Sequence, residues 1–76
     1  MSVVRILIWN LADSKTTLAE LREQLPPLDD GDYWLANDAQ ERFGLVSTSD
    51  EPPDLTRVRD LVGKEPEIAE EYDLIE

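Results

Sequence analysis

An apolar run with the length of a β-strand opens the chain. Residues 3–9 are β-branched, leucine or tryptophan apart from Arg5, and they predict a strand. Both sides of this strand are apolar, with Val4, Ile6 and Ile8 on one side and Val3, Leu7 and Trp9 on the other. A strand of this kind needs cover on both faces of its sheet.

The next segment has a helical period. A stripe at i, i+3 and i+7 predicts a helix, and its members are Leu18, Leu21 and Leu25. Thr17 is placed to cap it, because its hydroxyl can accept from the amide of Glu20. The prolines at 26–27 end the helix, and residues 29–32 form a turn.

Two further strands are predicted at residues 33–37 and 43–48, joined by a polar connection over 38–42. Gly44 lies inside the second of them, which indicates a bulge or the close approach of another group. A loop over 49–53 follows. The two strands and their connection form a β-hairpin in the middle of the chain.

A second helix begins after Asp54, which is a favourable N-cap residue. Its apolar stripe consists of Leu55, Val58, Leu61 and Val62. Gly63 stands where a helix commonly ends in a left-handed residue. Residues 66–76 are compatible with helix or strand, and we expect one helical turn through Ile68 and Ala69 before an edge strand.

This order predicts a single α+β domain over residues 1–76, with the ferredoxin-like β-α-β-β-α-β pattern and an antiparallel sheet. Right-handed crossovers place both helices on one face of the sheet. The other face is then bare, although the first strand is apolar on both sides. A second copy can cover it about a two-fold axis, so we expect a homodimer that forms a dimeric α/β barrel.

The charge and composition of the chain limit the kinds of molecule that we expect it to bind. The chain has 18 acidic and 7 basic residues, no Cys and no His, and a formal net charge of −11. Such a charge repels nucleic acid and anionic membranes, so we expect neither as a partner. With no Cys, no long apolar segment and no leader pattern, we expect a cytoplasmic protein. We expect no cofactor and no metal. The acidity is typical of a solvated surface, or of an acidic decoy for a basic partner protein.

Three stretches resemble small monooxygenase-like proteins of the dimeric α/β-barrel superfamily: residues 8–17 with Leu21-Arg22, then Trp34, Asn37-Asp38 and residues 42–44, and finally residues 58–66 with Tyr72-Asp73. The family is longer and has an aromatic stretch where this chain has residues 45–49. The resemblance implies the same fold, and it implies cofactor-free binding or modification of a small aromatic molecule.

The resemblance also directs attention to residues that could act on an aromatic substrate. The catalytic candidates are Asn10, Trp34, Tyr33 and Arg42, and Trp9, Asn37 and Tyr72 are further polar or aromatic groups of the same kind. Each has a structural alternative, since tryptophans pack in cores, asparagines form turns and arginines close hairpins. We expect Trp34 and Asn10 to line one pocket if the site is catalytic. A filled core instead favours a non-catalytic homodimeric interaction or regulatory module.

Overall fold

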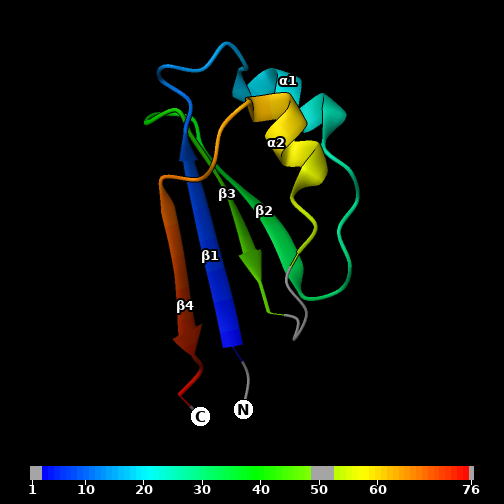
Figure 1. Ribbon diagram of the computed structural model, residues 1–76, viewed down its shortest axis with the longest axis vertical. Coiled ribbons are helices and arrows are strands. Elements are labelled where there is room, and N and C mark those ends of the chain that lie inside the picture. Colours follow the sequence, from blue (N-terminus) through cyan, green and yellow to red (C-terminus); the bar gives the residue numbers. More distant parts are fainter. Residues whose placement is uncertain (1–2, 49–52, 76) are drawn as a thin grey trace.

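The computed structural model describes residues 3–48 and 53–75, in which four strands and two helices alternate (Figure 1). In chain order they are β1 (Val3–Asn10), α1 (Leu18–Gln24), β2 (Asp32–Asn37), β3 (Arg42–Ser47), α2 (Thr56–Val62) and β4 (Ile68–Asp73). The predicted α+β class is confirmed. The predicted loop over 49–53 lies almost wholly outside the described residues.

The strands form one antiparallel sheet in the order β2-β3-β1-β4. β1 is central, with β3 on one side and β4 on the other, and β2 pairs with the outer side of β3. The register is continuous in all three pairs, so Gly44 forms no bulge. Directly opposed residues point to the same face of a sheet. Trp9 and Phe43 therefore share one face, and Ile8 and Gly44 share the other.

Both helices cover the face that carries Trp9. The buried cluster joins the sheet, the loop after β1 and both helices, and its members are Trp9, Leu11, Leu21, Phe43, Leu45, Val58 and Val62. The rings of Trp9 and Phe43 lie 5.4 Å apart, and Trp34 stacks on the other side of this group at 5.3 Å from Phe43. The helices lie near the end of β1, and β4 runs along the edge away from them (Figure 1).

Helix α1 begins as its sequence predicts. Thr17 is the N-cap, and its hydroxyl accepts a hydrogen bond of 3.2 Å from the backbone N–H of Glu20. Leu21 is buried under the helix, and the helix ends at Leu25, directly before the two prolines. The first helical turn is thus fixed by a cap and the last by residues that cannot continue it.

Helix α2 begins one residue later than expected. The N-cap position belongs to Leu55, which offers no side-chain acceptor, so the prediction of Asp54 as N-cap is wrong. Asp54 instead accepts from the N–H of Thr56 at 3.0 Å, as an Asx turn leading into the helix. Gly63 ends the helix in the left-handed conformation at φ 81°, as predicted.

The C-terminal segment forms a strand from Ile68 to Asp73, so the predicted helical turn through Ile68 and Ala69 is wrong. These residues pair with Ile8 and Leu7 of β1. A turn of four residues gains little helical hydrogen bonding, whereas the edge of β1 offers a full ladder. The carboxylate of Glu67 anchors the start of β4, accepting from the N–H of Asn10 at 2.6 Å. Neither described helix is long and apolar enough to cross a membrane.

Candidate functional site

The face of the sheet opposite the helices carries a continuous apolar surface, which we call the open face. It consists of Val4, Ile6 and Ile8 of β1, Tyr33 and Leu35 of β2, Val46 of β3, and Ile68 and Tyr72 of β4. Tyr33 is 61% exposed and Tyr72 is 49% exposed. Large apolar side chains left in water on one face mark an interaction surface more often than chance does.

Gly44 lies in the middle of this face, and Cδ1 of Ile8 already takes up the space that a Cβ at Gly44 would need. A shallow depression of about 370 Å³ lies beside it, with a floor of apolar side chains and a polar rim. Its lining includes Ile8, Leu35, Gly44 and Ile68, with Asn37 and Arg42 at the rim. The depression is too open to enclose a ligand by itself.

Two charges stand on the open face, at distant points. Arg42 begins β3 at one end of the face, and Glu70 lies in the middle of β4. Glu70 accepts a hydrogen bond of 2.5 Å from the hydroxyl of Tyr72, two residues along the same strand. This bond raises the pKa of Tyr72 above its ordinary value, because donation to a carboxylate favours the protonated phenol. Arg42 has no ion pair among the residues that the structure describes.

The structure brings together only some of the candidates from the sequence. Asn10, Arg42 and Asn37 occupy one row across β1, β3 and β2 at the end of the open face. Tyr33 stands on the same face but opposite Val46, four residues further along β3. The side chain of Asn10 accepts from the N–H of Ala12 at 3.0 Å, which is the turn-forming role of asparagine.

Trp34 lies on the other side of the sheet from Asn10, so the two do not line one pocket. It follows Tyr33 on β2 and therefore points to the helix face, where its indole N–H donates to the carbonyl of Pro26 at 3.1 Å. Trp9 is fully buried, and its N–H donates to the carbonyl of Lys64. Both indoles thus serve packing, with their polar atoms satisfied by backbone carbonyls.

A groove of about 370 Å³ runs between α1 and β2, beside Trp34. It is lined mainly by apolar groups, including Leu18, Leu25 and Phe43. Arg22 at its edge is already engaged with Asp38 at 3.1 Å. The groove could hold a flat apolar group, but none of its lining residues is a free acid or base, so it offers binding without proton transfer.

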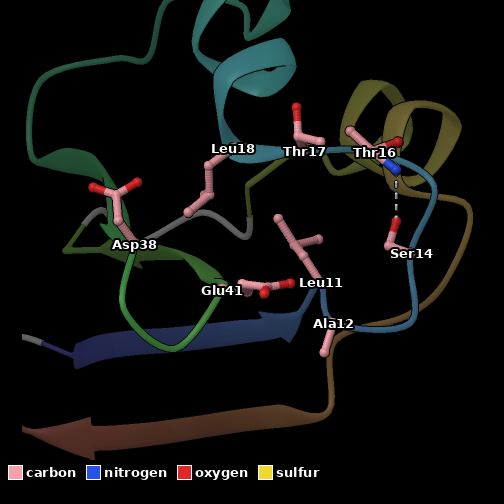
Figure 2. Close-up of a pocket in the computed structure, with 8 residues that line it drawn as sticks. All are labelled: Leu11, Ala12, Ser14, Thr16, Thr17, Leu18, Asp38 and Glu41. Atoms are coloured by element: carbon pink, nitrogen blue, oxygen red, sulfur yellow. Dashed lines mark hydrogen bonds between the residues drawn. The ribbon is translucent and has the colours of Figure 1, made fainter.

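A more polar pocket of about 390 Å³ lies between the β1–α1 loop and the β2–β3 turn (Figure 2). Its hydroxyls are occupied by backbone partners: Ser14 accepts from the N–H of Thr16, and Thr16 donates to the carbonyl of Leu61. Asp38 and Glu41 approach it from the turn (Figure 2). These residues thus hold the loop before α1 through side-chain bonds to the backbone.

No metal site is formed in the described part of the chain, where no three His, Cys, Asp or Glu side chains are grouped to hold an ion. The lowered pKa of Glu67 arises from its bonds to Lys64 and to the N–H of Asn10, which is a structural role. The open face is therefore the candidate functional site. Compared with protein-family models and with curated protein sequences, the chain matches none.

Proposed function

We propose that this protein is a non-catalytic homodimeric interaction module of the ferredoxin-like fold. In this proposal the open faces of two copies pack together and form a dimeric α/β barrel. The strand order β2-β3-β1-β4 and the placement of both helices on one face support the ferredoxin-like topology. The observation that carries the proposal is the open face, which is apolar across all four strands.

The size of the open face is compatible with a weak dimer. Four strands about 4.8 Å apart and six residues of about 3.4 Å each give a footprint of roughly 400 Å² per protomer. Side-chain relief brings the accessible area of two such faces to about 1,000 Å², near the lower limit for specific pairs. We therefore expect dissociation in the micromolar range.

Binding or modifying a small aromatic molecule is less well supported. It rests on the resemblance to monooxygenase-like proteins, and it requires a pocket that unites Trp34 with Asn10. Those side chains lie on opposite faces, and Trp34 is stacked in the core. The role of an acidic decoy rests on net charge alone, which a solvated surface explains equally well.

Sedimentation equilibrium of the unmodified protein tests the proposal. We expect a dimer at micromolar concentration and physiological salt. Leu35→Lys places a charge on the open face without touching the buried cluster, and it should yield a folded monomer. Ala39→Lys in the β2–β3 turn adds the same charge away from the face and should leave the dimer intact. A wild-type protein that stays monomeric at millimolar concentration would show the proposal to be wrong.

A further inference from the structure

The two charges of the open face cannot neutralise each other within one protomer. Arg42 stands opposite Asn10, and Glu70 stands opposite Ile6, so they flank β1 four residues apart along it. With strands about 4.8 Å apart and a rise of about 3.4 Å per residue, the two positions are roughly 17 Å apart. Covering the face with a partner would bury at least Glu70 without a cation, which is costly.

A second copy supplies the missing charges. We propose that the two-fold axis of the dimer lies obliquely across the open face, so that Arg42 of each protomer pairs with Glu70 of the other. This inference rests on the homodimer proposed above and specifies its geometry. The bond from Tyr72 already holds the carboxylate of Glu70 on the face, ready to accept the guanidinium.

The position of the axis follows from the register. A two-fold axis that lies between two facing sheets, parallel to both, carries each position of one sheet to the position reflected across the axis on the other sheet. For Arg42 to lie over Glu70 of the second copy, the axis must therefore pass midway between these two positions and at a right angle to the line that joins them. That midpoint is Ile8, one strand and two residues from each. Tyr33 also lies on the line, because it is about 14 Å from both charges on the same lattice. Ile8 and Tyr33 therefore each meet their own copies.

The same axis places an apolar side chain over the depression beside Gly44. Reflection across the line through Ile8 and Tyr33 brings Ile6 of the second copy within about 3 Å, measured along the sheet, of the position above Gly44. The strands of the two sheets cross at roughly 70°, close to the orthogonal class of sheet packing. The arrangement that pairs the two charges therefore also covers the depression with an apolar side chain.

Other arrangements do not pair these charges. An axis parallel to the strands keeps every residue within its own row across the sheet, so Arg42 and Glu70 never meet. An axis perpendicular to the strands keeps every residue on its own strand, and the two charges belong to β3 and β4. Only an axis oblique to the strands brings Arg42 of each protomer to Glu70 of the other.

Charge reversal tests the pairing by sedimentation equilibrium at fixed salt. Arg42→Glu and Glu70→Arg should each weaken the dimer at least tenfold, and the double variant should return to within about threefold of wild type. Net charge alone predicts the reverse for Glu70→Arg, since the chain becomes less negative. Glu23→Arg on α1 and Arg57→Glu on α2 make the same charge changes off the face, and they should not reproduce these losses.

A second measurement does not depend on the charged residues. The chain has no cysteine, so one introduced thiol can be linked by a short bis-maleimide. Ile8→Cys should cross-link, because Ile8 meets its copy at the axis. Val4→Cys should not, because the two Val4 positions lie roughly 22 Å apart. Efficient linkage through Val4, or a double reversal that fails to restore the dimer, overturns the oblique axis and leaves the homodimer standing. A monomeric wild type overturns both.

Discussion

Gly44 lies in β3 opposite Ile8 of β1, and space rather than backbone conformation requires glycine there. A Cβ at this position would stand 2.7 Å from Cδ1 of Ile8 and 2.8 Å from the carbonyl oxygen of Leu7. The oxygen belongs to the sheet ladder and cannot move aside. We expect Gly44→Ala to destabilise the fold by about 1–3 kcal/mol, the range for overpacking, as measured by urea denaturation.

Gly63 provides the matched control for Gly44. Nothing lies within 4 Å of a Cβ at Gly63, but its φ is 81°, in the left-handed region. Asparagine tolerates that conformation better than alanine does. Gly63→Asn should therefore be milder than Gly63→Ala, whereas Gly44→Asn should be at least as damaging as Gly44→Ala. If asparagine proves equally mild at both sites, the steric explanation for Gly44 is incorrect.

The close approach at Gly44 was predictable from a glycine inside an apolar strand, but the placement of Trp34 and Asn10 on opposite faces of the sheet was not. Because side chains alternate along a strand, Tyr33 and Trp34 lie on opposite faces of the sheet, and they cannot both line one site on a single face. Which one faces the helices depends on the pairing of Trp34 with Leu45 across the β2–β3 hairpin, which has no signature in the residues next to either of them. Side-chain periodicity fixes relative orientation, and only the sheet register fixes the absolute one.

At the scale of elements, Glu67 ties the start of β4 to the end of β1. Its carboxylate is bonded to Lys64 at 2.7 Å and to the N–H of Asn10, and these bonds hold the pKa of Glu67 below its ordinary value of 4.5. A carboxyl with a lowered pKa in the folded state stabilises that state above its unfolded pKa. The contribution is lost as the pH falls through the lower folded value.

We therefore expect Glu67→Gln to lower the melting temperature at pH 7 by a few degrees or less, with the difference from wild type shrinking as the pH falls from about 5 to 3. Thermal unfolding followed by circular dichroism at a series of pH values measures this. Glu23→Gln, on the exposed side of α1, controls for the loss of one negative charge. A difference that stays constant over the whole range would assign Glu67 no role in the pH dependence.

The ends of the helices and strands show which features the sequence next to them is sufficient to predict. Thr17 and Gly63 were predicted correctly because a cap and a left-handed terminus are decided within four residues. Asp54 was misplaced by one position, because an Asx turn and an N-cap use the same side chain and the same neighbouring amides. β4 was predicted partly as helix because its residues pair with residues of β1 that lie sixty to seventy positions earlier in the sequence.

For the whole molecule, charge opposes the association that the apolar face favours. Treated as point charges of −11 about 20 Å apart, two protomers repel by roughly 25 kcal/mol in water before screening. The Debye length falls from about 30 Å at 0.01 M salt to about 8 Å at 0.15 M, which removes most of that energy. The two ion pairs between Arg42 and Glu70, which the interface covers in part, contribute about 1–4 kcal/mol each and also weaken over the same range.

The repulsion between whole protomers is the larger of the two effects, and salt weakens it. Raising the salt concentration from 0.01 to 0.15 M should therefore lower the dissociation constant of the dimer by tenfold or more. Sedimentation equilibrium at several salt concentrations measures the change directly. Glu23→Arg reduces the net charge to −9 without altering the open face, and it should make the dimer less dependent on salt. Dissociation on adding salt would instead mean that attraction between local charges outweighs the repulsion between whole protomers, and that the apolar open face is not the main source of affinity.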